Sequence, residues 1–437
     1  MTRHVATTFE PLCGNIPALS EVPSRNRNQH YCSQVDQSKR PNGFCRRAPL
    51  VAATAMLLAD MAGLASAQIR LPPVTTTYNL TDLSPNAPQY YWSWAYAINN
   101  SGRVVGEFYN SQHWDRAFES QPNALIQNTD DLGVLTINGT ADLVSRCLAI
   151  NSSGNVVGDS VGVSPVKVSE SHAFLLVPGT GLENLNTTSS SGSFLLSNVR
   201  ETFSRGINDA GWIVGSFTIP SDSLSNFYQS HSFVSFGPGW TQPIDSWYGN
   251  PAFSATYDVN NKDQVVGYLQ PHANDSPTAF FFDTSTLHLT TIGIPPGASL
   301  SVANALNDSG QVVVNATFGQ FSHAFLFQDL NHNGFADPGE LMDLDPTDSN
   351  SAALSINNGG IAVGYHGGLP NNGGSSTAAI FTNGKITDLN TLVNGGTRGA
   401  ILRVAYGIND NGQIVGFMDT PSGDIHAFRL DPVRRLP

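Results

Sequence analysis

Short apolar segments alternate with polar turns along most of this chain. The clearest unit, Gly407–Gly416, reads GINDNGQIVG: an apolar strand end, a polar turn closed by glycine, and a second apolar strand that stops at glycine. Asn, Asp and Gly tolerate turn geometry, and Val and Ile favour strands, so the unit predicts a β-hairpin. Further copies occupy 97–106, 149–158, 206–215, 258–267, 305–314 and 355–364.

The seven copies recur with a period near 50 residues. The apolar residue before each turn marks the period, and consecutive markers are 47 to 57 residues apart. The markers are Ile98, Ile150, Ile207, Val259, Leu306, Ile356 and Ile408. A β-rich period of this length is typical of propeller blades rather than helical repeats.

Each period contains further strand candidates. An apolar segment related to HAFLL follows each hairpin, beginning at Arg116, His172, His231, Thr278, His323, Thr377 and His426. In most copies a shorter run follows, with an acidic or amide residue before Leu, at 130–135, 183–186, 342–345 and 387–390. Four strands per period would form one antiparallel blade.

The two ends of the repeat region complement each other. The last copy ends near Leu430 without a fourth strand, whereas Tyr78–Leu83 supplies an unpaired strand before the first hairpin. Pairing these two ends closes a ring and leaves no sheet edge exposed. We therefore predict an all-β, seven-bladed β-propeller of four-stranded blades whose last blade is closed by the N-terminal strand. A β-solenoid or packed β-sandwiches are the alternatives.

The strand that ends at each marker is expected to be innermost. Nearly every copy has small residues one and three positions before the marker, such as Ala97 and Ala95, and positions two apart share a strand face. Crowding near a propeller axis explains their size. Asp258 breaks the pattern in the fourth copy, and we interpret it as a hydrogen-bonded carboxylate, with a channel-lining role as the alternative.

The combination of a GIND-x-G-x-x-VG hairpin with a downstream HAF tripeptide and a TDL run resembles the bacterial extracellular HAF-repeat family. The resemblance covers residues 78–430, with the best matches at 206–215, 323–325 and 407–428. It implies export and a propeller-like β architecture. It supplies no catalytic residues, because none are generally established for the family.

The N-terminal region differs from the repeats. Residues 46–67 combine a basic pair, an apolar run and small residues at Ala65 and Ala67, which is the layout of a secretory signal peptide, although Asp60 interrupts the run. We divide the chain into an extension at 1–45, disordered or arising from a misassigned start, a signal peptide at 46–67, and a repeat domain at 68–437. The protein is expected to be secreted or extracellular, or tethered to the membrane by an uncleaved signal anchor.

The charge balance narrows the range of partners. The chain of 437 residues has a net charge of −13, and residues 1–67 contain seven basic and four acidic residues, so their removal deepens the charge to −16. Such a surface repels phosphate backbones, which excludes nucleic acid as a partner. Without residues 46–67 no membrane span is expected, and we predict a monomer that binds an extracellular protein or glycan.

One segment carries a specific chemical signal. Residues 329–340, DLNHNGFADPGE, match the twelve-residue calcium-loop spacing, with side-chain oxygens at positions 1, 3, 5, 9 and 12, glycine at 6 and a main-chain carbonyl at 7. The predicted ligands are Asp329, Asn331, Asn333, Phe335, Asp337 and Glu340. The preceding segment resembles a strand, so we predict a structural Ca²⁺ in an insertion between strands.

Other conspicuous residues are given structural roles. The repeated histidines are predicted to hydrogen-bond a turn of their own or the adjacent blade, with a ring of metal ligands as the alternative: His172, His231, His323 and His426. Cys147 takes a position filled by Ala or Ser elsewhere and is expected to be small and buried. Trp92 and Trp94 are expected to be buried rather than to form an exposed binding platform.

No motif for a known reaction is present. The sequence lacks a G-x-S-x-G elbow, an H-E-x-x-H zinc motif, a phosphate loop and a dinucleotide fingerprint. We predict a calcium-stabilised binding or scaffold protein at or outside the cell surface. The alternative is a secreted carbohydrate-active hydrolase or lyase with a site at the channel mouth, for which Asp258 and Glu201 are the nameable acids.

Overall fold

The computed structural model describes most of the repeat region. All described residues belong to the unit Gln68–Pro437. They are 69, 76–84, 92–109, 115–163, 169–186, 199, 201–220, 228–237, 241–346, 350–368, 375–382 and 384–433. The predicted extension at 1–45 and signal peptide at 46–67 lie outside them.

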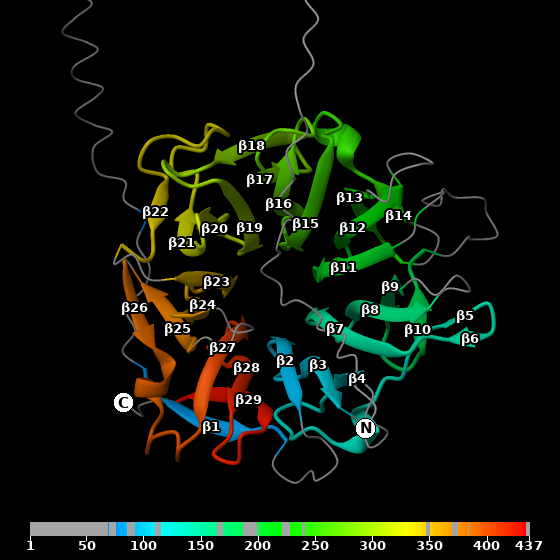
Figure 1. Ribbon diagram of the computed structural model, residues 1–437, viewed down its shortest axis with the longest axis vertical. Coiled ribbons are helices and arrows are strands. Elements are labelled where there is room, and N and C mark those ends of the chain that lie inside the picture. Colours follow the sequence, from blue (N-terminus) through cyan, green and yellow to red (C-terminus); the bar gives the residue numbers. More distant parts are fainter. Residues whose placement is uncertain are drawn as a thin grey trace, which may run out of the picture. The chain divides into compact units, whose positions relative to one another are not determined.

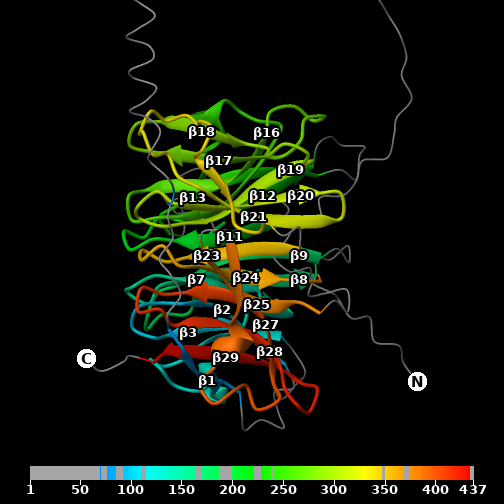
Figure 2. The same ribbon diagram turned by 90° about the vertical axis from the view of Figure 1, so that its left-hand side faces the viewer.

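Seven antiparallel sheets surround a common axis, so the prediction of a seven-bladed β-propeller is confirmed (Figure 1). Turned by 90°, the strands run across the thickness of the ring (Figure 2). The ring excludes the solenoid and the packed sandwiches.

The blades follow one another in chain order, each written from its first strand. Blade 1 has β2 (Ser93–Ile98), β3 (Val104–Tyr109) and β4 (Asp115–Glu119); blade 2 has β7 (Val144–Ile150), β8 (Val156–Val163), β9 (Ser169–Leu176) and β10 (Leu182–Asn184); blade 3 has β11 (Glu201–Ile207), β12 (Ile213–Pro220), β13 (Tyr228–Ser235) and β14 (Thr241–Pro243). Blade 4 has β15 (Phe253–Val259), β16 (Gln264–Gln270), β17 (Thr278–Asp283) and β18 (His288–Gly293); blade 5 has β19 (Leu300–Leu306), β20 (Val312–Phe318), β21 (Phe321–Phe327) and β22 (Leu341–Asp343). Blade 6 has β23 (Ser351–Ile356), β24 (Ala362–His366), β25 (Thr377–Thr382) and β26 (Lys385–Asp388); blade 7 has β27 (Ile401–Ile408), β28 (Ile414–Asp419), β29 (Ile425–Pro432) and β1 (Tyr78–Asp82).

A few elements lie outside this pattern. The two-residue strands β5 (Thr136–Ile137) and β6 (Thr140–Ala141) form a small hairpin, and the helical elements are the short 3₁₀ turns η1 (Asn128–Asp130), η2 (Asp245–Tyr248) and η3 (Leu389–Leu392). Within the described residues, no helix has the length and apolar character needed to cross a membrane.

The N-terminal strand completes the last blade, as predicted. Strand β1 pairs antiparallel with β29 from Tyr78 opposite Pro432 to Asp82 opposite Phe428. Blade 1 departs from the prediction, because the segment at 130–135 contributes only one bridge, between Phe118 and Asp131, instead of a fourth strand. The following chain turns away there into the β5–β6 hairpin.

The repeated glycine and phenylalanine are two parts of one packing arrangement. A Cβ added to Gly106 would lie 1.9 Å from the carbonyl oxygen of Trp94 and 2.9 Å from the Phe118 ring, so only glycine lets the inner strand and this ring approach so closely. Gly158 has the same relation to the Phe174 ring in blade 2. Phe118 and Phe174 are fully buried, and each such side chain contributes about 1.5–3 kcal/mol through burial.

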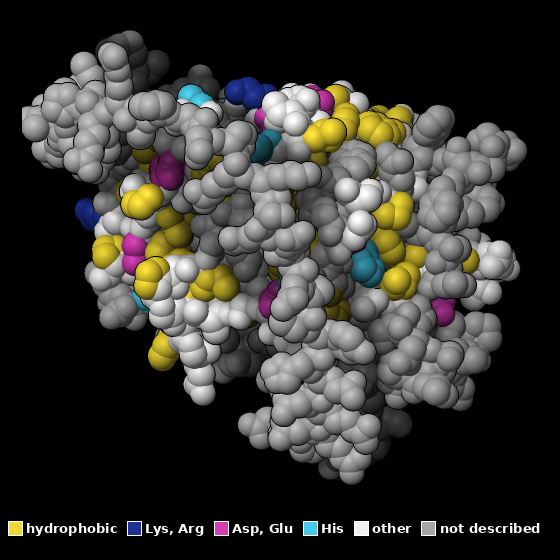
Figure 3. Space-filling view, turned by 90° about the horizontal axis from the view of Figure 1, so that it is seen from above, with side chains coloured by type: hydrophobic (Ala, Val, Ile, Leu, Met, Phe, Trp, Pro, Cys, Tyr) yellow, Lys and Arg dark blue, Asp and Glu magenta, His cyan; other side chains and the backbone are white. Residues whose placement is uncertain are grey.

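Apolar packing continues around the ring, since each core cluster combines residues of neighbouring blades. On the rim seen in Figure 3, Lys and Arg side chains are sparse among the described residues, as the acidic composition leads one to expect.

A closed ring of asparagine side chains joins all seven blades. The residue after each marker is asparagine, and its amide Nδ2 donates to the main-chain carbonyl of the equivalent asparagine in the next blade at 2.9–3.0 Å. The bond from Asn409 to the carbonyl of Asn99 closes the circle. We call this set the inner Asn ring: Asn99, Asn151, Asn208, Asn260, Asn307, Asn357 and Asn409.

The same side chains also fix the hairpin turns. Each Oδ1 accepts the main-chain N–H four residues later, as in the bond from Gln413 to Asn409 at 2.9 Å. All seven asparagines are at most 5% exposed. Turn chemistry therefore explains only half of their bonding, because the other half holds the blades together.

Replacement of one ring member tests this double role. We expect Asn307→Ala to lower the free energy of unfolding by roughly 2–4 kcal/mol, because the carbonyl of Asn357 and the N–H of Gln311 both lose a buried partner. The free energy is measured by urea unfolding. Asn274→Ala, at an exposed loop position, is the control and should change it by about 0.5 kcal/mol or less. Equal stability of the two variants would contradict the role of the ring.

Candidate functional site: an acidic axial pocket

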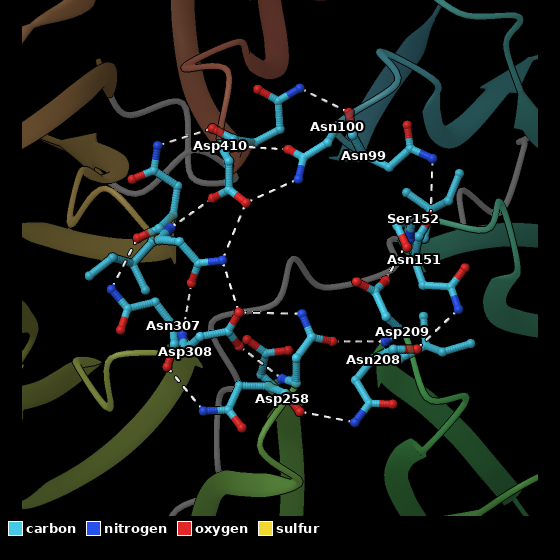
Figure 4. A pocket seen from close by; sticks show the side chains of 18 of the residues that line it. Asn99, Asn100, Asn151, Ser152, Asn208, Asp209, Asp258, Asn307, Asp308 and Asp410 are labelled. Carbon is cyan, nitrogen blue, oxygen red and sulfur yellow. Dashed lines mark hydrogen bonds between the residues drawn. The ribbon is translucent and has the colours of Figure 1, made fainter.

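The seven hairpin turns meet around a pocket on the axis. Its volume is about 190 Å³, and every blade contributes three consecutive residues, namely the marker, the inner Asn ring member and the next residue. Of the residues described, Asp258 is the one further member of the lining (Figure 4). The sequence pattern that forms the hairpins therefore also builds the pocket wall.

The residues that follow the inner Asn ring form a second circle. In six of the seven blades, the main-chain N–H of one member donates to the side-chain Oδ1 of the next at 2.8–2.9 Å. Among the described residues, the Asn100 N–H makes no such bond to Ser152, whose side chain is shorter and has no Oδ1. We call this set the outer ring: Asn100, Ser152, Asp209, Asn261, Asp308, Asn358 and Asp410.

Negative charge is concentrated in this pocket. Asp209, Asp308 and Asp410 lie in alternate blades, and Asp258 adds a fourth carboxyl group. No Lys, Arg or His occurs among the lining residues that the structure describes. The second oxygens of Asp308 and Asp410 accept amide N–H groups of Asn358 at 3.0 and 3.2 Å. Among the described residues, the second oxygen of Asp209 has no hydrogen-bond donor. The pocket therefore attracts cationic groups.

Asp258 lies in the pocket wall, so the interpretation as a hydrogen-bonded carboxylate is correct but incomplete. Its Oδ1 accepts the N–H of Val259 at 2.9 Å, and its Oδ2 accepts the N–H of Leu306 in the next blade at 3.1 Å. Burial, with a smaller contribution from the charge of Asp308, raises the pKa of Asp258 to about 7. The other nameable acid, Glu201, does not line the pocket and accepts a bond from Thr218 at 3.3 Å. The structure does not bring these two acids together.

The repeated histidines have local structural roles. Nδ1 of His172 bonds to Asp142 at 3.1 Å, and Nδ1 of His426 bonds to Asp82, in its own blade, at 2.9 Å. His231 makes the equivalent bond to Asp245, which follows β14. His323 packs against the Phe318 ring, with ring centroids 4.8 Å apart. These contacts lie on separate blades and form no ring of metal ligands among the described residues.

Two other predictions about single residues have different outcomes. Cys147 is a fully buried free cysteine, as predicted, and burial raises the pKa of its thiol. Trp92 is 43% exposed, so its predicted burial is wrong. It packs edge-on against Tyr109 and Trp94, with centroid distances of 5.4 and 6.5 Å, at the start of blade 1 where the chain enters the sheet.

The predicted calcium loop connects β21 to β22. Asp329 accepts the N–H groups of Asn333 and Gly334 at 3.2 and 2.9 Å, which curls the first half of the loop around its carboxylate. Gly334, at loop position six, has a φ of +78°, a backbone conformation that favours glycine. The first half of the loop thus has the sharp turn that its sequence predicts.

The second half of the loop brings the remaining predicted ligands near one another. Glu340 accepts the N–H of Asp337 at 2.9 Å, and Asp337 accepts the side-chain amides of Asn331 and Asn333 at 2.8 and 2.7 Å. No three His, Cys, Asp or Glu side chains form a metal-holding group in the part of the chain that is described. The oxygen-rich residues fit a calcium ion chemically, but the two amides must turn their oxygens inward to bind one.

No protein-family model and no curated protein matches the chain. Several solved structures match the chain in fold, and two of them serve as examples. The β-propeller domain of the Trilobed protease from Pyrococcus furiosus, which has an open velcro topology, gives a TM-score of 0.45 at 10% identity, covering 82% of this chain and 98% of that chain. The Penicillium chrysogenum α-L-arabinanase complexed with arabinobiose gives a TM-score of 0.37 at 10% identity, with the same coverage. We transfer neither activity to this chain, and the resemblance to HAF-repeat proteins stays a prediction.

The raised pKa of Asp258 gives a pH-dependent stability. Well below pH 3.8 the carboxyl group is protonated in both the folded and the unfolded state. As the pH rises towards 7, the carboxyl group of the unfolded chain ionises first, so the free energy of unfolding falls. Relative to Asp258→Asn, we expect wild-type stability to drop by about 2–4 kcal/mol between pH 4 and pH 8. Urea unfolding of both proteins across this range provides the comparison. If the free energies of unfolding of the two proteins changed in parallel with pH, the pKa of Asp258 would not be raised in the folded protein.

Proposed function

We propose that this protein is an exported binding module whose axial pocket receives a cationic group of an extracellular partner. The observation that carries the proposal is the composition of the pocket, whose described lining residues include four carboxyl groups and no basic side chain. An unbalanced cluster of carboxyl groups in a concave site favours a positively charged ligand. A lysine or arginine side chain of a partner protein supplies such a group, which favours a protein over a neutral glycan.

The hydrogen bonding of the pocket supports binding rather than catalysis. The outer-ring side chains are largely occupied by main-chain N–H groups of neighbouring blades, and a carboxylate with that role is poorly placed to exchange protons with a substrate. The carbohydrate-active alternative needs two acids acting on one bond, and its candidates Asp258 and Glu201 are not joined in the pocket.

Export is part of the proposal and is supported by the sequence. Residues 46–67 have the layout of a secretory signal, and the repeats resemble those of HAF-repeat proteins. A chain without residues 1–67 keeps one cysteine, Cys147, and therefore can form no intramolecular disulfide. We expect a secreted monomer, with N-terminal sequencing of the exported protein beginning at Gln68.

We also propose a structural calcium ion in the loop at 329–340. The loop is anchored on the neighbouring blade, since Thr290 of β18 donates its hydroxyl to the carbonyl of Gly334 at 2.7 Å and the His288 ring lies edge-on to Phe335 at 5.7 Å. An ion that rigidifies this insertion would therefore strengthen the junction between blades 4 and 5. Extracellular modules typically bind calcium with dissociation constants on the order of 10⁻⁴–10⁻³ M.

The charge of the pocket can be removed without changing its shape. In Asp209→Asn/Asp308→Asn/Asp410→Asn, each amide oxygen can still accept the N–H of the preceding blade. We expect binding of the peptide acetyl-Gly-Lys-Gly-amide to weaken at least tenfold in this variant, measured by NMR titration. Wild-type binding should also weaken at high salt.

A charge-matched control separates the pocket from the net charge of the molecule. Asp131→Asn/Asp275→Asn/Asp424→Asn changes the total charge equally at positions outside the pocket. This control should bind the lysine peptide like the wild type, and acetyl-Gly-Glu-Gly-amide should bind to none of the proteins. Equal loss in both triple variants would refute the pocket as the binding site.

Calcium binding is tested by calorimetry on separate variants. Asp329→Ala and Glu340→Ala should each abolish the calcium titration and the calcium-dependent rise in melting temperature, because each removes a predicted ligand at one end of the loop. Asp275→Ala, an exposed aspartate of a different loop, should behave as the wild type. Unchanged binding in both loop variants would remove this site.

A further inference from the structure

Each inner strand also contains a β-bulge, two residues before its aliphatic marker. Each inner strand has a register shift between the residues one and three positions before its marker, so the residue between them is unpaired. We call these the bulge residues: Tyr96, Leu148, Arg205, Tyr257, Asn304, Leu354 and Tyr406. Bulges re-aim side chains, and Arg205 is the only charged member of the set.

The guanidinium of Arg205 has no hydrogen-bond acceptor among the described residues. Its carbon lies 5.4 Å from the centroid of the Phe203 ring, and neighbouring protein desolvates it, which lowers the pKa of the group. The residue nevertheless keeps some exposed surface. A guanidinium carries five N–H donors, and leaving them unpaired in a desolvated place is costly. The N–H groups of the Arg205 guanidinium are therefore available to a ligand that supplies acceptors.

An unused acceptor lies in the neighbouring blade. Arg146 donates from Nε to Oδ2 of Asp159 at 2.8 Å, and Asp159 is completely buried. The other oxygen of Asp159, Oδ1, has no hydrogen-bond partner among the residues that are described. The residues just before Arg205 and Asp159 are in direct contact, because the Ser204 hydroxyl donates to the carbonyl oxygen of Gly158 at 2.6 Å. The charge of Asp159 favours the charged form of Arg205, yet no hydrogen bond joins the two side chains. A partly exposed donor set and a buried acceptor thus lie on contacting strands without satisfying one another.

The surroundings favour a hydroxylated ligand. The rings of Tyr257 and Tyr268 lie 6.3 Å apart in blade 4. The inner strand of this blade approaches the strand of Arg205 closely, since a Cβ added to Gly206 would lie 3.3 Å from the Tyr257 carbonyl oxygen. In blade 1, Tyr96 donates its hydroxyl to Glu107 at 2.5 Å, and burial raises the pKa of that carboxyl group. Aromatic rings pack against the C–H faces of sugars, and hydroxyl and carboxyl groups bond to their hydroxyls.

We propose that Arg205 and Asp159 form a second binding site, for a small hydroxylated carboxylic acid of the uronate class. Arg205 would pair with the ligand carboxylate, and Oδ1 of Asp159 would accept one of its hydroxyls. A phosphate dianion fits less well, because the Asp159 carboxylate would repel it. The site is separate from the axial pocket, which has the opposite charge preference and whose lining includes neither Arg205 nor Asp159.

Binding of galacturonate to the full chain tests this site, with galactose and inorganic phosphate as comparison ligands. We expect calorimetry to detect galacturonate, to show binding at least tenfold weaker in Arg205→Gln, and to detect neither comparison ligand at the same concentration. Arg403→Gln is the matched control, because Arg403 is also on an inner strand but is already bonded to Asp419 at 2.7 Å. This control should bind galacturonate like the wild type.

Thermal unfolding separates a binding role from a structural one. Because Arg205 has no acceptor, Arg205→Gln should melt at or above the wild-type temperature, and galacturonate should raise the melting temperature of the wild type but not of this variant. A clear drop in melting temperature would instead make Arg205 a structural residue. Absent galacturonate binding, equal binding in Arg205→Gln, or phosphate binding as strong as galacturonate binding would each overturn the proposal.

Discussion

The hydrogen bond from each inner-ring asparagine to the next blade is the constraint on which the rest of the structure depends. A propeller blade buries its faces against its neighbours, but apolar packing alone does not fix the angle between successive blades. A side-chain amide that reaches one particular carbonyl does fix it, because hydrogen bonds tolerate little change in distance or direction. Seven such bonds, closed by the one from Asn409 to Asn99, fix the angle of every blade relative to its two neighbours.

This constraint explains which parts of the repeat vary. The inner asparagine is present in all seven copies, whereas the histidine of the third strand is replaced by Arg116, Thr278 or Thr377 in three blades. The histidine bonds only locally, so its loss affects a single contact. Loss of an inner asparagine breaks a turn and an inter-blade bond together. The side chains of the outer ring and of the bulge residues differ from blade to blade, and the two proposed binding sites use these positions.

Much of the fold could be predicted from the sequence because its signals are local and repeated. Every marker ends an inner strand, and the pairing of Tyr78–Asp82 with the last blade followed from counting strands at the two ends. The missing fourth strand of blade 1 could not be foreseen, because the 130–135 segment has strand-like residues and only the neighbouring hairpin draws it away. The exposure of Trp92 likewise depends on how the chain enters the sheet.

The candidate sites were less predictable, because they arise from the ring rather than from any one repeat. Asn and Asp in a turn are adequately explained by turn geometry, and their bonds to other blades become visible only when equivalent residues face one another around an axis. Asp258 likewise lies in the pocket wall because its strand faces the axis, which the sequence of one repeat does not reveal. The role of Arg205 depends on a bulge, and the sequence around it differs little from an ordinary strand.

Hydrogen exchange at the seven hairpin turns tests the central claim most directly. The main-chain amides that donate to the inner Asn ring belong to Arg103, Asn155, Trp212, Gln264, Gln311, Ile361 and Gln413. If the ring is closed, all seven should exchange slowly and at similar rates, because each can open only when the ring itself opens. One or more of these amides exchanging as fast as an exposed loop would show that the ring is open and that the blades are held by apolar packing alone.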